Sequence, residues 1–319
     1  MTATVAARPR ALDPAKFRDP NVTAKGEQRA AVALRALKTL WFNTGTLCNL
    51  ACRNCYIESS PDNDRLSYLS AGEAAAYLDE IAARGLPTEE IGFTGGEPFM
   101  NPDLPRMLED ALIRGFRVLV LTNAMKPMMK RAGELLRLRE RFGERLTIRA
   151  SIDHYAEPLH QMERGERSWV PAMEGLDWLV RHGFAVRIAG RTVWSEDEAS
   201  LRRGYARLFA ERGVPLDAHD PSHLVLFPEM DAGVDVPEIT TACWSILNRS
   251  PDAMMCASSR MVVKRSGAAR PAVVACTLLP YDPQFELGAT LAEAAGDVKL
   301  NHPHCARFCV LGGGSCSAA

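Results

Sequence analysis

The sequence predicts an α/β fold: a six-unit partial (βα)6 TIM-like barrel followed by a small C-terminal cysteine-rich hairpin/helix module. From about residue 38, short β-branched or aromatic runs alternate with longer segments of helical period. Nine cysteines fall into two groups, three between 48 and 55 and six between 243 and 316. A glycine also follows each of five helical segments, where it can end a helix in the left-handed conformation: Gly85, Gly115, Gly143, Gly183 and Gly213.

Six runs are expected to form the parallel strands of the barrel: Thr39–Thr46, Glu90–Thr94, Arg117–Thr122, Leu146–Ser151, Ala185–Val193 and His223–Phe227. Capping boxes predict helices that open at Ser70, with Glu73, and at Ser195, with Glu198. Right-handed crossovers curl such units one way, and eight would close a barrel. Six leave it laterally open, or else form an open doubly wound sheet. Ligands of either fold gather at the carboxyl ends of the strands.

Three regions are expected along the chain. Residues 1–37 form a lead-in with one helix near Gly26–Leu37, residues 38–235 form the barrel, and residues 236–319 form the cysteine-rich module. We assign no function to the lead-in.

Composition and charge exclude several classes of protein. Among 319 residues, 38 Lys and Arg against 39 Asp and Glu leave a net charge of −1, which gives no basic footprint for nucleic acid. No apolar run approaches the roughly 20 residues of a membrane span, and the N-terminus lacks the apolar core of a secretory signal. We therefore expect a cytoplasmic protein with no nucleic-acid or membrane partner.

The first cysteine group indicates a metal site. An odd number of cysteines without an export signal makes a disulfide framework a poor interpretation. Directly after the first strand comes Cys48-x3-Cys52-x2-Cys55. Three thiolates on a four-iron cubane leave one iron open for a ligand. The alternative, a structural zinc site, would want a fourth Cys or His nearby, and no other lies between Asn43 and His154.

Polar or glycine residues at the strand ends are the candidate ligand-binding residues. Paired glycines let a backbone approach a ligand closely, and the second strand runs into Gly95, Gly96, Glu97 and Pro98. Later strand ends add four candidates: Asn123, Ser151, Asp153 and Arg191. Arg187 has the same face parity as Arg191 and is the alternative for its role.

The second cysteine group predicts another metal site. Cys256 and Cys276 flank a hairpin pattern with its midpoint at 266, so they should face each other at its open end. A helical stretch at Thr290–Ala295 precedes Cys305-x3-Cys309-x6-Cys316. Two hairpin thiols and two tail thiols suit a second four-iron cluster. We expect Cys316 as a substitute ligand and Cys243 as spare. Zinc remains the alternative, with His302 and His304 beside Cys305.

With these motifs, the chain resembles the radical S-adenosylmethionine (SAM) superfamily, whose cysteine loop follows the first strand of a six-unit partial barrel. The resemblance implies that Cys48, Cys52 and Cys55 hold a [4Fe–4S] cluster and that the GGEP segment receives the SAM amino group. It further implies SAM contacts for Asn123, Ser151, Asp153 and Arg191. The family usually has an aromatic residue or His before the third cysteine. Here that position is Asn54, and Tyr56 follows as the second candidate for contacting adenine.

The C-terminal module resembles the shortened SPASM-type extension called a twitch domain. This implies an auxiliary [4Fe–4S] cluster on Cys256, Cys276, Cys305 and Cys309, with Cys316 in reserve. The implied activity is reductive cleavage of SAM to a 5′-deoxyadenosyl radical, which abstracts hydrogen from a substrate that the auxiliary cluster then oxidises. A flavodoxin- or ferredoxin-type reductant would supply the electron. A short lead-in favours a small-molecule substrate over a ribosomally made peptide. A non-enzymatic electron-transfer protein is the third alternative.

Overall fold

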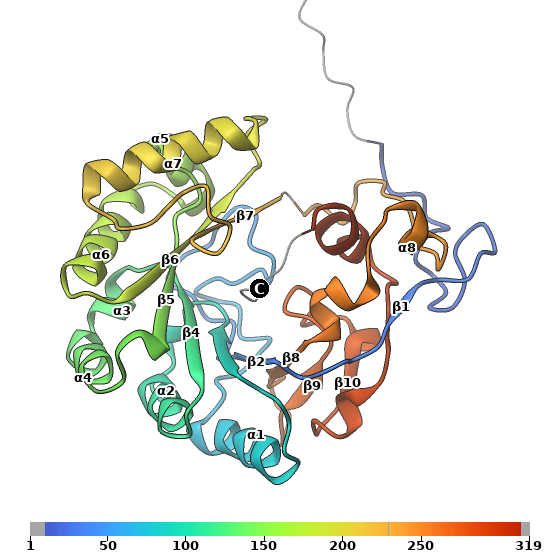
Figure 1. Cartoon of the computed structure of the whole chain (residues 1–319), viewed down its shortest axis with the longest axis horizontal. Helices are drawn as coiled ribbons and strands as arrows, with labels where there is room; N and C mark the ends of the chain where they lie inside the picture. The colour runs from blue at the N-terminus through green and yellow to red at the C-terminus, as the bar shows by residue number, and fades with distance from the viewer. Residues whose placement is uncertain (1–9, 229, 314–319) are drawn as a thin grey trace, which may run out of the picture.

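The fold is built on one nine-stranded sheet, ordered β10-β9-β8-β2-β3-β4-β5-β6-β7. The computed structural model describes residues 10–228 and 230–313. All six predicted barrel strands are confirmed and pair in parallel in sequence order (Figure 1). Their bounds are β2 Thr39–Asn43, β3 Glu90–Thr94, β4 Arg117–Thr122, β5 Leu146–Ser151, β6 Ala185–Arg191 and β7 Leu224–Phe227. The predicted partial barrel is therefore correct.

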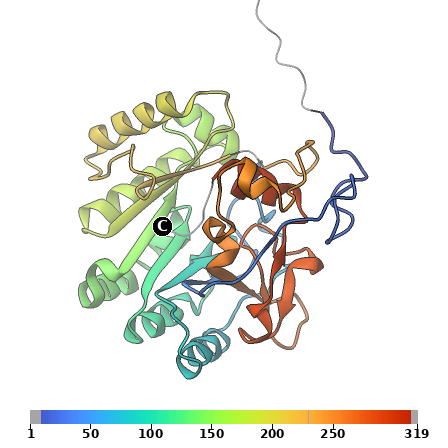
Figure 2. The same ribbon diagram turned by 45° about the vertical axis from the view of Figure 1, so that its right-hand side comes forward.

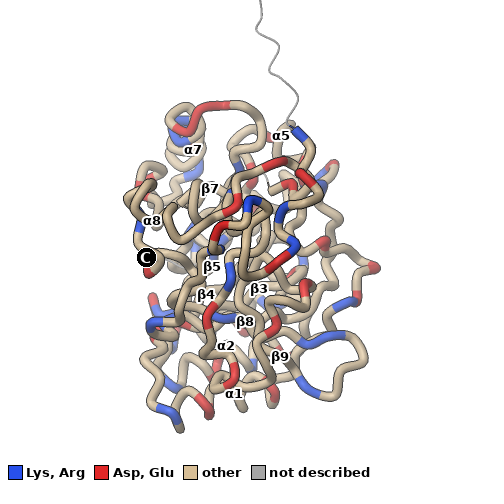
Figure 3. The backbone as a smooth tube through the Cα atoms, turned by 90° about the vertical axis from the view of Figure 1, so that its right-hand side faces the viewer, with Lys and Arg blue, Asp and Glu red and all other residues tan. Residues whose placement is uncertain are grey.

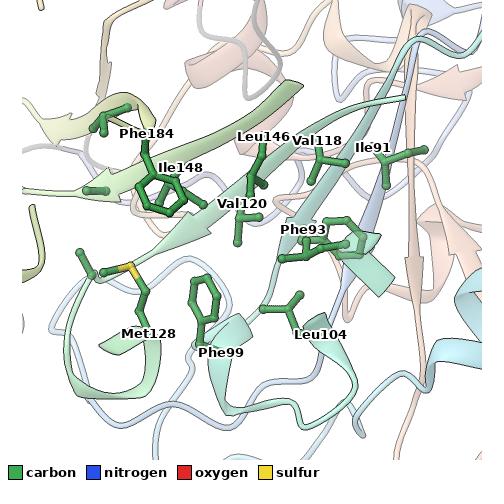
Figure 4. Close-up of a cluster of buried hydrophobic side chains, with 14 of the residues drawn as sticks. Ile91, Phe93, Phe99, Leu104, Val118, Val120, Met128, Leu146, Ile148 and Phe184 are labelled. Atoms are coloured by element: carbon green, nitrogen blue, oxygen red, sulfur yellow. The ribbon is translucent and has the colours of Figure 1, made fainter. Parts of the chain in front are cut away.

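Helices cover the outer face of this sheet, and a large apolar core fills the space between. They are α1 Ala71–Ala83, α2 Leu104–Ile113, α3 Lys126–Met129, α4 Ala132–Phe142, α5 Glu157–Arg164, α6 Trp169–Arg181 and α7 Glu198–Arg212. Figure 4 shows part of the core, where Phe93 and Val120 from the strands meet Phe99 and Leu104. Within residues 10–228 and 230–313, no helix is both long enough and apolar enough to cross a membrane.

The predicted caps of the helices are found in the structure with one exception. Ser70 and Glu73 form the predicted capping box of α1, and all five glycines predicted to end helices have positive φ. The prediction of Ser195 as a cap is wrong. Asp197 caps α7 instead, its carboxylate accepting from the Ser200 backbone N–H, because the helix begins two residues later than a Ser195 capping box requires.

The cysteine-rich region completes the sheet rather than standing apart from it. Strand β8 (Ser259–Val263) pairs in parallel with β2, and β9 (Ala272–Val274) and β10 (Glu286–Gly288) continue the sheet antiparallel. The predicted hairpin exists, but Met261 pairs with Val274, so its midpoint lies beyond 266. Because of this shift, Cys256 and Cys276 are not opposite each other, although both still flank the open end. The expected helix at Thr290–Ala295 is a short 3-10 turn, Glu293–Ala295.

The lead-in packs against the C-terminal region, and its predicted helix is wrong. Strand β1 (Ala31–Val32) pairs with β11 (Val298–Lys299), and both views show the blue segment beside the orange and red one (Figures 1 and 2). The Arg29 guanidinium forms a buried ion pair of 2.5 Å with Glu238. These long-range bonds take the backbone groups that a helix would use, so tertiary contacts override the alanine-rich helix propensity.

Candidate functional site

A cavity opens at the carboxyl ends of the barrel strands, where the sequence placed the site. Cys48, Cys52 and Cys55 all line it. Seven of the predicted cofactor-binding residues line it as well: Tyr56, Gly95, Gly96, Asn123, Ser151, Asp153 and Arg191. The other two, Glu97 and Pro98, are buried side chains next to this lining. One wall of one cavity thus gathers residues from the cysteine loop and from the ends of four strands.

The two glycines allow β3 to pack against the cysteine loop. A Cβ on Gly96 would lie 2.2 Å from the Leu47 carbonyl oxygen, and a Cβ on Gly95 would lie 2.5 Å from the Gly45 oxygen. The Gly96 N–H donates to the Gly45 oxygen at 2.8 Å. Glycine is therefore required here by the neighbouring backbone. Close approach to the cysteine loop is thus one reason for this pair, and the close approach to a ligand that the sequence predicts remains a prediction.

Glu97 fastens the ends of β3 and β4 together. It is 2% exposed, and its carboxylate accepts from the Thr122 hydroxyl at 2.8 Å and the Asn123 backbone N–H at 2.9 Å. Burial raises the pKa of Glu97 to about 7, against the lowering effect of these donors. The side chain thereby fixes Asn123, which lines the cavity.

Two of the three cysteine sulfurs in the cysteine loop accept hydrogen bonds from backbone N–H groups. The Leu50 N–H donates to the Cys48 sulfur at 3.4 Å, and the Ser59 N–H donates to the Cys55 sulfur at 3.3 Å. Burial raises the pKa of Cys48 to about 12 and also raises that of Cys52. Such buried sulfurs are neutral thiols without a metal, and a bound metal deprotonates them. Backbone N–H donors to the sulfurs are a usual feature of iron–sulfur sites.

A buried ion cluster lies directly behind the cysteine loop. Arg164 binds Asp153 through two contacts, at 2.6 and 3.1 Å, and Arg191 lies 3.5 Å from the same carboxylate. Burial alone would raise the pKa of Asp153, but the two guanidinium groups lower it below its ordinary value. The Arg164 charge also acts on Cys52, where it opposes the effect of burial. The cluster therefore places a guanidinium group near Cys52, with the carboxylates of Asp153 and Glu163 opposing its effect.

Asn54 and Tyr56 have different tasks in this loop. Glu163 accepts from the Asn54 backbone N–H and side-chain amide, both at 2.8 Å, and Arg191 donates to the Asn54 carbonyl at 2.7 Å. Asn54 is therefore occupied in anchoring the loop to α5. Tyr56 lines the cavity, and the Arg191 guanidinium lies 4.6 Å from its ring centroid.

Sequence reasoning missed Glu163 and Arg164. Both lie at the end of α5, far in sequence from the cysteine loop, and resemble ordinary surface charges. One available signal was the Arg164–Gly165 pair after a helical segment that follows the Ser151–Asp153 strand end. Arg187, the alternative to Arg191, does not line the cavity.

Five of the six C-terminal cysteines belong to, or pack against, one large apolar core in the C-terminal region. Cys256 and Cys305 are part of it, and Cys243, Cys276 and Cys309 pack against it, whereas Cys316 lies outside the described residues. Burial raises the pKa of Cys256 to about 11 and that of Cys305 to about 12. In the part of the chain that the structure describes, no three His, Cys, Asp or Glu side chains meet as ligands of a single ion would.

Cys243 and Cys276 also accept hydrogen bonds at sulfur. The Thr240 N–H donates to Cys243 at 3.4 Å, and the Leu278 N–H donates to Cys276 at 3.3 Å. Thr277 and Leu278 line the same cavity as the first cysteine group. The two residues that follow Cys276 thus line the cavity, although none of the described C-terminal cysteines does. Our expectation that Cys243 is spare remains a prediction.

Arg260 places a buried positive charge beside these cysteines. It is 1% exposed, and its guanidinium donates to four backbone carbonyls, those of Cys256, Ser259, Ala294 and Gly296. No carboxylate of the described residues forms an ion pair with it. The carbonyl acceptors and the more distant Asp297 carboxylate offset part of the cost of burying this charge, and thiolates at the neighbouring Cys256 and Cys276 would offset more.

A match to a protein-family model identifies the family of this chain. A model of the "Radical SAM superfamily" matches residues 42–199, from the end of β2 into α7. The chain belongs to the radical SAM superfamily. It is therefore an enzyme of the class that uses SAM with an iron–sulfur cluster, and the predicted family is confirmed.

Curated relatives and solved structures agree with this membership. The chain is 30% identical over 169 residues to the antilisterial bacteriocin subtilosin biosynthesis protein AlbA of Bacillus subtilis, covering 53% of this chain and 35% of AlbA. It is 32% identical over 142 residues to the AdoMet-dependent heme synthase of Oleidesulfovibrio alaskensis, covering 44% and 34%. The chain thus spans about a third of the length of these relatives.

Two radical SAM structures share the fold at low sequence identity. SuiB of Streptococcus suis bound to S-adenosylmethionine superimposes with a TM-score of 0.57 at 12% identity, over 80% of this chain and 64% of SuiB. anSMEcpe with bound AdoMet gives 0.56 at 13% identity, over 80% and 79%. At these identities the likeness supports the fold alone, and it extends beyond the barrel into the C-terminal region.

The glycine packing generates the first prediction. In Gly96→Ala, the new Cβ would overlap the Leu47 carbonyl, so the cysteine loop must move. We expect reconstituted protein to lose about four irons and to form 5′-deoxyadenosine about a hundredfold more slowly, as a shift near 1 Å can cause. Gly72→Ala is the matched control, because nothing lies within 4 Å of its new Cβ. Full iron content and activity in Gly96→Ala would show that this packing is dispensable.

Proposed function

We propose that this enzyme holds a [4Fe–4S] cluster on Cys48, Cys52 and Cys55, cleaves SAM reductively, and abstracts hydrogen from a small-molecule substrate. One observation carries the proposal: all three thiols open onto the cavity that also gathers the predicted SAM-binding strand ends. When held by Cys48, Cys52 and Cys55, the reduced cluster would supply the one electron needed to split SAM into methionine and a 5′-deoxyadenosyl radical. The non-enzymatic alternative is set aside, because the family is one of enzymes.

The residues of the chain bind and orient SAM in this proposal. The strand ends at Gly95, Gly96, Asn123 and Ser151 supply polar groups on the cavity wall. Arg191, with its Nη1 atom buried and without a hydrogen-bond partner in the described structure, is the candidate for the SAM carboxylate. Glu97 and Pro98 act behind the wall, where Glu97 positions Asn123. Tyr56 is the aromatic face for adenine. Asp153 neutralises the arginines.

An auxiliary [4Fe–4S] cluster on the C-terminal cysteines would balance the Arg260 charge. A cubane with four thiolates carries net negative charge, which the buried guanidinium would stabilise. We assign Cys256, Cys276, Cys305 and Cys309 as its ligands, with Cys316 as the substitute. Because Thr277 and Leu278 line the cavity next to Cys276, this cluster would stand near enough to accept an electron from the substrate radical. The net reaction would then be an oxidation.

We infer the class of substrate from the residues that line the cavity. The barrel and the C-terminal region both line the cavity, so the reacting group must fit between them. This favours a small molecule. A peptide is the second candidate, because one matched structure is SuiB bound to its precursor peptide SuiA, with a TM-score of 0.55 at 13% identity. AlbA, by its name, serves bacteriocin biosynthesis.

The external electron would come from a flavodoxin- or ferredoxin-type carrier. A cysteine that must bind iron as a thiolate needs a reducing compartment, which is why we propose a cytoplasmic location.

The cluster assignment can be tested by iron counting. Wild-type protein reconstituted without oxygen should bind about eight irons, as two cubanes. Replacing Cys48, Cys52 and Cys55 together by Ala should leave about four irons and abolish 5′-deoxyadenosine formation. SAM cleavage by this triple variant would refute the assignment. A colorimetric iron assay and chromatography of the nucleoside products provide the two measurements.

The Arg260 argument predicts a change in redox behaviour. In Arg260→Gln, loss of a nearby positive charge makes reduction of the auxiliary cluster less favourable. Its midpoint potential should fall by an amount on the order of 100 mV. Arg260→Lys retains the charge and should change the potential much less. Electron paramagnetic resonance during a redox titration measures this for each cluster. Equal potentials in wild type and Arg260→Gln would contradict a cluster beside Arg260.

Substrate class can be separated by size and protease sensitivity. A substrate accelerates SAM cleavage, because productive hydrogen abstraction uses the radical. We expect stimulation of 5′-deoxyadenosine formation by the cell-extract fraction below about 1 kDa, unchanged after protease treatment. Stimulation confined to a larger, protease-sensitive fraction would instead establish the peptide alternative.

A further inference from the structure

A second groove lies on the outer side of the cysteine loop. It is lined by Asn49, Phe99, Met100, Lys126, Pro127, Lys130 and Arg131. Three of these residues are basic and none is acidic. Lys126 and Lys130 are exposed, and neither forms an ion pair with a carboxylate of residues 10–228 or 230–313. The groove therefore combines an apolar floor with uncompensated positive charge.

The groove and the SAM cavity share one wall. Cys48 lines the cavity, and the next residue, Asn49, lines the groove. The Asn123 side-chain amide donates to the Asn49 oxygen at 2.9 Å, and Asn123 itself lines the cavity. A single stretch of backbone thus separates the outer surface from the Cys48 thiol.

Positive charge continues along the surface beyond the groove. An adjoining depression shares Arg131 and adds Arg106, Arg137 and Arg141, with two carboxylates, Glu109 and Glu134. Three of these arginines are paired, Arg141 with Glu109, Arg131 with Glu134 and, at 3.9 Å, Arg106 with Asp103, so the cations of the strip that are unpaired within the described residues are Lys126, Lys130 and Arg137. The whole chain carries a net charge of −1, and charges of both signs alternate along the backbone in Figure 3. The cationic strip is therefore a local concentration of charge.

We propose that this strip, centred on Lys126 and Lys130, docks an acidic one-electron carrier protein. The inference rests on the proposed function, because it assumes a cluster on Cys48 that an external donor must reduce. The carrier is oxidised by one electron and the cluster is reduced by one, with no bond made or broken in the carrier. Opposite charge steers such an encounter and orients the partner. The apolar floor at Phe99 and Met100 gives the partner a surface to bury.

The test compares a protein donor with a chemical one. In the reconstituted full chain, Lys126→Glu combined with Lys130→Glu should raise the KM for a reduced acidic flavodoxin at least about tenfold in 5′-deoxyadenosine formation. The dependence of this rate on ionic strength should also weaken. Dithionite, a small reductant that needs no docking surface, should support the same rate as in wild type.

A matched charge reversal controls for net charge. Lys25 and Arg84 are exposed, and Arg84 lies at the end of α1, toward the opposite ends of the strands. Lys25→Glu combined with Arg84→Glu should leave the KM for flavodoxin unchanged. An unchanged KM in the Lys126 and Lys130 variant, or an equal rise in the control, would overturn the docking site. Loss of the dithionite-driven rate in this variant alone would overturn it too, because the two lysines would then act within the catalytic site. Failure of wild type to cleave SAM with dithionite would instead refute the proposed function.

Discussion

The site depends on the buried ion cluster of Asp153, Glu163, Arg164 and Arg191. Each of these charges is costly to bury, and the cost is offset only by close pairing with good geometry. Asp153 and Arg164 are closely paired: the Arg164 Nη2 donates to one carboxylate oxygen at 3.1 Å, and its Nε lies 2.6 Å from the other. The remaining hydrogen bonds of the cluster go to Asn54, so the energy of pairing also fixes the cysteine loop. Residues 44–70 contain no helix or ladder strand of their own, and they need such an anchor.

The GGEP segment supports the same loop from the other side. Gly95 and Gly96 let the end of β3 come within hydrogen-bond distance of residues 45–47, and Glu97 ties that end to β4. This motif therefore acts largely through the cysteine loop and the neighbouring strand. A loop held on both faces can present three thiols in a fixed arrangement, which is the preorganisation that a reactive metal site needs.

Much of this architecture could be predicted from the sequence because it depends on local patterns. The barrel strands and the capping box of α1 follow from side-chain alternation and from spacings within one turn. What could not be predicted arises from distant contacts. The lead-in extends along the C-terminal region because Arg29 pairs with Glu238, and β8 joins β2 although over two hundred residues separate them. Glu163 and Arg164 were missed for the same reason, since only the fold brings α5 behind the cysteine loop.

Packing contacts join the barrel's cysteine loop to the C-terminal region. Tyr56, directly after Cys55, packs against Phe227 at 5.9 Å, and Phe227 stacks on Phe308 at 5.5 Å. Phe308 lies in the π-helix Cys305–Leu311, a form of helix often found at functional sites. Tyr281 also donates to the Ile57 carbonyl at 2.7 Å. Because these contacts bridge the barrel and the C-terminal region, a displacement of either cysteine group must disturb the other. The spacing between the two iron sites would then be a property of the folded chain and would not depend on the substrate.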